Sequence, residues 1–162
     1  DHRVDITNGK ILYKNDKYYA WAYRKGRANV KLSVRDKEGE MKKVTERTFR
    51  VKTLPKPEAV LHNKSGGKIS PRILKMQKKL RAENPDLDIA ANYKIVGFNI
   101  TYISGQGGGM LTEEVKGAQF SGKARKVIDM AESGDIYIFD EIQVKGPDGR
   151  NMQIDGIVFN II

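Results

Sequence analysis

Apolar and polar residues alternate with a period of two through much of the first third of the chain. Residues 28–34 follow this pattern, with an apolar residue at every second position from Ala28 to Val34. This is typical of a strand with one buried face. Residues 45–52 alternate in the same way and place Phe49 on the face predicted to lie inward. These two segments are predicted to be strands.

Turn signals divide the rest of this region into short strands. Asn8-Gly9 and Asn15-Asp16 flank the apolar segment 10–13, and a second apolar and aromatic segment follows at 18–23. Such dipeptides favour tight turns between strands. Several short strands at this spacing predict a β-sandwich.

A first helix is predicted from Ser70 to about Asn84. Serine can cap the free amides at the start of a helix, and the following proline loses no hydrogen bond at the first helical position. Ile73, Met76 and Leu80 would share its apolar face. The dipeptide Asn84-Pro85 ends the pattern.

A second helix is predicted from about Ser121 to Glu132, and Ser133-Gly134 would end it. Its buried stripe would consist of Ala124, Val127, Ile128 and Ala131.

Three further strands are predicted around this helix. The first is 93–102, and its predicted inward face consists of Val96, Phe98, Ile100 and Tyr102. The segments 135–144 and 152–161 would form a hairpin across the turn Gly146–Gly149, with Ile157 and Phe159 facing the core.

Two prolines, Pro55 and Pro57, mark the predicted domain boundary, because proline disfavours both helix and ladder pairing. The predicted fold class is mainly β with two α-helices (α+β): a partial Ig-like β-sandwich domain, then a small α+β C-terminal domain. The predicted boundaries are 1–54 for the partial sandwich, 55–68 for a linker and loop, and 69–162 for the C-terminal domain.

Charge is distributed unevenly along the chain. Residues 1–81 contain 23 Lys and Arg against 8 Asp and Glu, whereas residues 82–162 contain 7 against 12. The basic half could attract an acidic partner or the acidic half of a second copy. A solvated, soluble surface is the simpler interpretation. The chain contains no cysteine, and its apolar runs are too short to span a bilayer.

No catalytic, cofactor-binding or metal-binding set of residues is predicted. The glycine cluster 105–109 follows a strand, but it lacks the spacing of a dinucleotide or phosphate loop and is interpreted as a hairpin or insertion loop. His2 and His62 have no partner at ligand spacing. The neighbouring carboxylates Asp140 and Glu141 would point to opposite faces of a strand.

Binding of nucleic acid or another anionic polymer is the alternative function. Tyr18, Tyr19, Trp21 and Tyr23 precede a cluster of cations at residues 24–27. Aromatic rings beside cations can stack bases and bind phosphates. However, Tyr19, Trp21 and Tyr23 also alternate as the core residues of a strand would, and no known nucleic-acid module is present.

Several segments in order resemble the GldM/PorM family of gliding-motility and type IX secretion proteins. Its third domain is similar to residues 8–11, 26–30, 49–52 and 54–57, and the opening of its C-terminal fourth domain is similar to residues 66–70. The hairpin at 135–150, with its Lys-Gly-Pro-Asp-Gly turn, is the most specific part.

This resemblance implies a periplasmic, non-enzymatic module without a cofactor. Family members are dimers of Bacteroidetes, anchored in the inner membrane by an N-terminal helix, where they form a proton-driven motor with GldL. Their C-terminal domains contact the outer-membrane-associated ring. By this resemblance, residues 1–162 would be the force-transmitting end of a periplasmic shaft. A GldL-like partner would contact only the N-terminal anchoring region of such a protein.

The resemblance also places the start of the third domain upstream of Asp1. An incomplete sheet would expose an unpaired edge that accepts a strand of a second copy. A homodimer is therefore expected. The expected dimer or partner interface consists of Tyr18, Tyr19, Trp21, Tyr23, Gly107, Gly108 and Met110.

Overall fold

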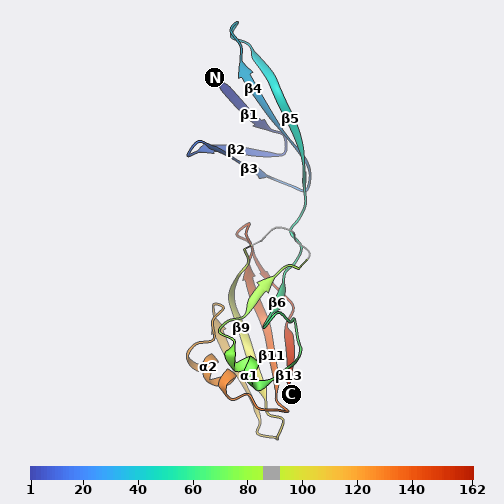
Figure 1. The fold of residues 1–162 in the computed structure, drawn as a ribbon, viewed down its shortest axis with the longest axis vertical. Helices are drawn as coiled ribbons and strands as arrows, with labels where there is room; N and C mark the ends of the chain where they lie inside the picture. Colours follow the sequence, from blue (N-terminus) through green and yellow to red (C-terminus); the bar gives the residue numbers. More distant parts are fainter. Residues whose placement is uncertain (86–91) are drawn as a thin grey trace. The chain divides into compact units, whose positions relative to one another are not determined.

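The structure is a computed structural model that describes residues 1–85 and 92–162. It is mainly β with two α-helices, which confirms the predicted fold class (Figure 1). The chain divides into two units, Asp1–Leu54 and Pro55–Ile162.

The first unit consists of a three-stranded antiparallel sheet and a separate hairpin (Figure 1). The sheet has the order β1 (His2–Ile6), β4 (Gly26–Arg35), β5 (Met41–Val51). The hairpin pairs β2 (Gly9–Lys14) with β3 (Lys17–Ala22). These strands contain the alternating segments identified from the sequence.

The inward face predicted for this sheet is only partly correct. Ala28 is buried, but Phe49 remains 52% exposed because its face borders an open apolar groove. The pairing of β4 with β5 shifts register between Leu32 and Ser33, where β5 contains one extra residue. Ser33 is buried, whereas Val34, which was predicted to face inward, is exposed.

A six-stranded sheet forms the framework of the second unit, with the order β10-β9-β11-β13-β7 and with β12 paired to β11. Its strands are β7 (Gly67–Ile69), β9 (Lys94–Ile103), β10 (Met110–Lys116), β11 (Ile136–Lys145), β12 (Asn151–Gln153) and β13 (Ile157–Ile161). All pairs are antiparallel except β13 with β7.

The first helix is shorter than predicted. Helix α1 spans Pro71–Met76, capped by Ser70, and Met76 is 67% exposed rather than buried. The chain then pairs with the segment before the second helix, because Leu80 N–H donates to Ala118 O at 2.9 Å. It continues into β8 (Arg81–Glu83), which pairs with β6 (Glu58–Val60).

The second helix begins near the predicted position and ends three residues early. Helix α2 spans Gly122–Asp129 and buries Ala124, Val127 and Ile128, whereas Ala131 is buried beyond its end. The hydroxyl of Tyr137 on β11 donates to the Val127 carbonyl at 2.7 Å and ties the helix to the sheet.

The core of the second unit is built around four phenylalanine rings. Phe139 lies 6.2 Å from Phe98, 5.9 Å from Phe120 and 6.3 Å from Phe159, measured between ring centroids. All four belong to one cluster of buried residues drawn from the sheet, both helices and the β6–β8 pair. Ile157 and Phe159 are buried as predicted.

Residues 55–68 contribute to this unit directly. They include β6 and the first residues of β7, and the side chains of Ala59 and Leu61 are buried in the core cluster. Asn84 Nδ2 and the Tyr93 hydroxyl both donate to the carbonyl of Pro55, at 3.1 Å each.

The predicted inward face of β9 is partly wrong, because a bulge on β11 changes which residues of β9 are buried. Glu141 adopts a positive φ of 49°, and the pairing of β11 with β9 shifts register after Asp140. Across the shift, buried positions on both strands are three residues apart instead of two. Ile95 is therefore buried with Phe98, whereas Val96, which was predicted to share the face of Phe98, is exposed.

Candidate functional site

Two aromatic side chains lie on one face of the β2–β3 hairpin. Tyr19 and Trp21 have ring centroids 6.3 Å apart, and both are exposed. Lys10 lies opposite Trp21 in the ladder, and its Nζ is 5.6 Å from the centre of the indole ring. This cation–π contact holds a positive charge beside an accessible aromatic surface.

The opposite face of the hairpin carries Tyr18. Its ring centroid lies 4.7 Å from that of Tyr13 and 5.7 Å from that of His2. The Tyr13 hydroxyl donates to Asp16 Oδ1 at 2.9 Å, and this hydrogen bond raises the pKa of Tyr13 above its usual value. These contacts orient the rings beside the turn of the hairpin.

An apolar groove of about 370 Å³ separates this face from the three-stranded sheet. It is lined by Val4, Ile6, Ile11, Tyr18, Ala20, Ala22, Ala28, Val30, Phe49 and Val51. The residues of β3 that face the groove are therefore Tyr18, Ala20 and Ala22. The interpretation of Tyr19, Trp21 and Tyr23 as core residues is wrong, since all three are exposed.

The glycine cluster forms the hairpin loop between β9 and β10. Ser104 N–H donates to Gly109 O at 3.0 Å and closes the loop, while Gly107 and Gly109 adopt positive φ angles of 80° and 98°. Met110 follows as the first residue of β10, and its side chain is exposed. The predicted interface residues thus fall into two groups, one in each unit.

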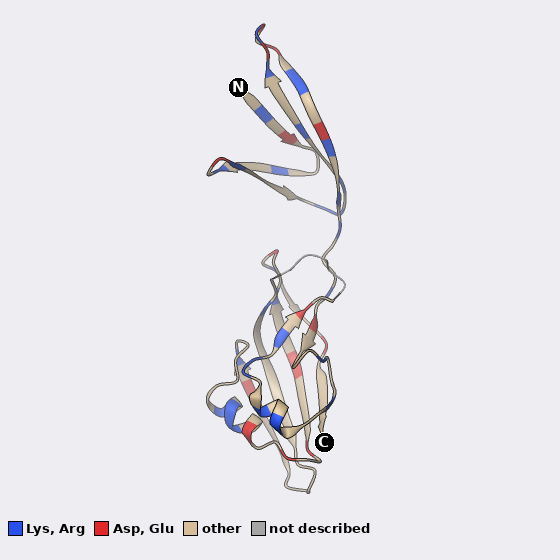
Figure 2. Ribbon diagram, in the orientation of Figure 1, with Lys and Arg blue, Asp and Glu red and all other residues tan. Residues whose placement is uncertain are grey.

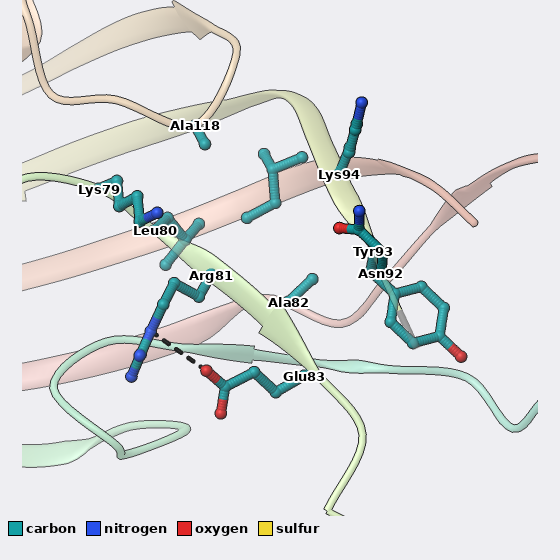
Figure 3. A pocket seen from close by; sticks show the side chains of 10 residues that line it. Lys79, Leu80, Arg81, Ala82, Glu83, Asn92, Tyr93, Lys94 and Ala118 are labelled. Atoms are coloured by element: carbon teal, nitrogen blue, oxygen red, sulfur yellow. Dashed lines mark ion pairs between the residues drawn. The ribbon is translucent and has the colours of Figure 1, made fainter. Parts of the chain in front are cut away.

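A shallow pocket of about 450 Å³ lies beside β8 and the start of β9 (Figure 3). Leu80, Ala82, Ile95 and Ala118 supply its apolar lining. Figure 3 shows Arg81 turned toward Glu83, and their ion pair measures 3.2 Å. Glu83, a carboxylate that lines this pocket, is therefore paired with a cation of the same strand.

The prediction that Asp140 and Glu141 point to opposite faces of a strand is wrong. The bulge places both between the buried residues Phe139 and Ile142, so both lie on the side of β11 away from the core. Glu141 sits at the bulge, where its Oε2 accepts a hydrogen bond from Asn99 Nδ2 at 3.0 Å. Among residues 1–85 and 92–162, no group of three or more His, Cys, Asp or Glu side chains could hold a metal ion. In the same residues, no helix is long and apolar enough to cross a membrane.

Arg125 forms a structural link that the sequence analysis missed. Its guanidinium donates to Gln77 O at 2.8 Å and to Lys75 O at 3.0 Å, and it pairs with Asp129 at 2.6 Å. It therefore joins α2 to the end of α1. The spacing of Arg125 and Asp129 by four residues on a helix indicates their ion pair, but not the bonds to α1.

Comparison with known families matches residues 55–162 to the family described as GldM C-terminal domain. The match covers the whole second unit. No curated protein matches the chain.

Proposed function

The chain belongs to the GldM C-terminal domain family, and we propose on that basis that it is a non-enzymatic structural and interaction module of a GldM-like motor shaft. The family gives the chain a role in the gliding and type IX secretion machinery. In this proposal the module lies in the periplasm and transmits force from the inner membrane to outer-membrane-associated ring proteins. The match over the entire second unit carries the proposal.

The construction of the second unit supports a mechanical role. One core cluster joins the sheet, both helices and the β6–β8 pair. Four phenylalanine rings lie within it, and Phe139 lies beside the other three. Close packing of this kind has low compressibility and transmits displacement. A rigid body with exposed recognition surfaces suits a shaft that carries load between partners.

A pull-down tests the proposal. The full chain would be immobilised and exposed to solubilised envelopes of a type IX secreting bacterium, and bound proteins would be identified by mass spectrometry. We expect enrichment of ring proteins of that system over a control bait of similar size and basic charge. Equal recovery on both baits would contradict the proposed function.

We further propose that the chain forms a homodimer through the first unit. The apolar groove and the exposed rings of Tyr18, Tyr19, Trp21 and Tyr23 leave apolar surface that a strand of a second copy could cover. Light scattering at several concentrations and salt levels tests this. A Trp21→Ser variant should dissociate more readily than a matched Lys37→Ser variant, since Lys37 lies in the β4–β5 turn outside the hairpin.

The glycine loop is a second proposed contact in this module. Gly107, Gly108 and Met110 lie at an exposed hairpin end, where Met110 presents an accessible apolar side chain. Flexible thioether side chains adapt to varied apolar partners. Met110→Ser should reduce recovery of ring proteins in the pull-down without reducing stability, whereas unchanged recovery would exclude this loop from the contact.

Binding of an anionic polymer through residues 1–81 is the second candidate function. The observation that favours it is that Lys10 is held beside the exposed Trp21 ring, and that Arg24 and Lys25 follow in the turn after β3. Polyanion binding weakens steeply with salt through counterion release, whereas apolar strand contacts do not. Titration with single-stranded DNA and with heparin at two salt concentrations separates these possibilities.

A further inference from the structure

Six exposed cations gather on α1, α2 and the segment that follows α1. We call them the helical basic surface: Arg72, Lys75, Lys78, Lys79, Lys123 and Lys126. Figure 2 shows blue segments on both helices. Within the residues that the structure describes, none of the six forms an ion pair.

The nearby acids leave most of this charge uncompensated. Asp129 is occupied by Arg125, and Glu113 and Glu114 share a hollow with Lys123 at the edge of the surface. The remaining cations face solvent. Unpaired like charges on adjoining elements repel one another, and an acidic partner would relieve that repulsion.

The backbone that carries these cations is fixed from several sides. Arg125 binds the carbonyls of Lys75 and Gln77, and Phe120 N–H donates to Lys78 O at 2.9 Å. The backbone positions from which these cationic side chains extend are therefore fixed before any partner binds. Preorganisation of this kind lowers the entropy cost of association.

Two methionines add apolar surface to the same elements. Met76 follows Lys75 on α1 and is 67% exposed. Met130 ends α2, is 45% exposed and lies four residues after Lys126, which places the two on the same side of the helix. Exposed methionine beside cations is suited to a protein surface that mixes acids with apolar residues.

We propose that the helical basic surface, with Met76 and Met130, is the docking site for an acidic protein surface that also presents apolar side chains. This inference rests on the proposed function and names the face of the module that contacts its partner. A single-stranded nucleic acid fits less well, because α1, α2 and residues 77–80 carry no aromatic ring for base stacking. A lipid surface also fits less well, since α2 buries its apolar stripe in the core.

Titration of the full chain with defined probes tests this inference. The probes are a peptide alternating glutamate with leucine, a peptide of equal charge with serine in place of leucine, polyphosphate, and phosphatidylglycerol vesicles. We expect the glutamate–leucine peptide to bind most tightly at equal charge and to shift NMR signals of α1 and α2. Tighter binding of polyphosphate or vesicles would overturn the proposal in favour of a phosphate-bearing ligand.

Matched variants locate the binding site. Lys75→Glu with Lys126→Glu should weaken binding of the glutamate–leucine peptide by about tenfold or more. Lys31→Glu with Lys145→Glu changes the net charge equally at exposed positions of β4 and β11, and should weaken it by less than about twofold. Equal losses in the two double variants would overturn the proposal.

The methionines have their own test. Met76→Ser with Met130→Ser should weaken binding of the glutamate–leucine peptide and leave binding of the glutamate–serine peptide unchanged. An unchanged affinity for both peptides would remove the apolar part of the proposal and with it the argument for a protein partner.

The envelope pull-down separates failure of this inference from failure of the proposed function. If the wild-type chain and the Lys75→Glu, Lys126→Glu variant recover ring proteins equally, the proposed function stands and the inference fails. If the wild-type chain recovers no ring protein, the proposed function fails, while the peptide titrations still decide whether the surface recognises acidic protein segments.

Discussion

Asp135 Oδ1 accepts a hydrogen bond from the backbone N–H of Gly105 at 2.9 Å, which joins the β9–β10 loop to the start of β11. The other carboxylate oxygen accepts from the N–H of Glu132 at 2.8 Å. Asp135 is buried, so both amides depend on this one side chain. The arrangement fixes the glycine loop against the end of the helical segment that precedes β11.

Asp135→Ala should therefore destabilise the second unit. The substitution removes the acceptor of two partly buried backbone hydrogen bonds, and we expect the free energy of unfolding to fall by about 2–3 kcal/mol. Urea denaturation followed by circular dichroism measures this. Asp155→Ala is the control, because Asp155 is exposed and forms a surface ion pair with Lys56, so its loss should cost less than about 1 kcal/mol. Equal losses would contradict the role given to Asp135.

Gly105→Ala tests the close approach of the same two loops. A Cβ added at Gly105 would overlap the backbone carbonyl of Gly134, which cannot move aside as a flexible side chain would. We expect a loss of about 1–3 kcal/mol in unfolding free energy. Gln106→Ala in the same loop replaces an exposed side chain and should leave stability nearly unchanged. A tolerated alanine at Gly105 would show that the loops can separate.

Substitutions on the two faces of β13 test the predicted core strand. Phe159 is fully buried, whereas its neighbour Val158 points to the other face and is 44% exposed. Phe159→Ala should cost about 3–5 kcal/mol, because it removes a large side chain from a packed core. Val158→Ala should cost less than about 1 kcal/mol. A loss below about 1 kcal/mol for Phe159→Ala would be incompatible with its burial.

Local pattern predicted the strands β2, β3, β4, β5, β9 and β11 and the helix α2, because each of these elements follows one period. It did not predict β1, β6, β7, β8 or β10, and it joined β12 and β13 into one strand. The end of α1 could not be predicted in this way. Residues 78–80 continue the helical pattern in sequence, but they pair with residues 118–120, and that pairing depends on a contact forty residues away. Long-range hydrogen bonding thus overrides the weak local preference for helix.

Bulges and exposed faces account for the other differences between the predicted and the observed buried residues. The positive φ of Glu141 shifts buried positions on β11 by one, and a sequence with neither glycine nor asparagine at that position gives no warning of it. Alternation in β3 correctly separated Tyr18 from Tyr19 and Trp21. Alternation could not show whether Tyr18 or the pair Tyr19 and Trp21 faces the three-stranded sheet, since both faces of the hairpin carry aromatic residues. The expected interface residues in the two units remain a proposal.

We propose that the two units unfold independently. Their separate cores and the prolines at 55 and 57 motivate this expectation. Trp21 is the single tryptophan and lies in the first unit, so its fluorescence follows that unit alone. In urea, the tryptophan transition should occur at a lower midpoint than the transition in hydrogen exchange of β11 amides. Coincident transitions, together with resistance of residues 52–58 to proteolysis, would indicate a single cooperative unit.

Tyr137 should make stability sensitive to alkaline pH. Burial, followed by the negative charge of Asp135, raises the pKa of Tyr137 above its ordinary value, so the folded state keeps the phenol neutral. Stability is therefore complete below the unfolded pKa of about 10 and falls as pH rises above it, because only the unfolded state then releases the proton. Tyr137→Phe should lose about 1–2 kcal/mol at neutral pH, since the Val127 carbonyl loses its donor.

The same substitution should flatten the decline in stability between about pH 9 and about pH 11. Urea midpoints of the second unit at several pH values measure the slope for wild type and variant. Tyr23→Phe is the matched control: it removes an exposed hydroxyl in the first unit and should leave both the midpoint and the slope of the second unit unchanged. A wild-type slope that persists in Tyr137→Phe would assign the alkaline sensitivity to another group.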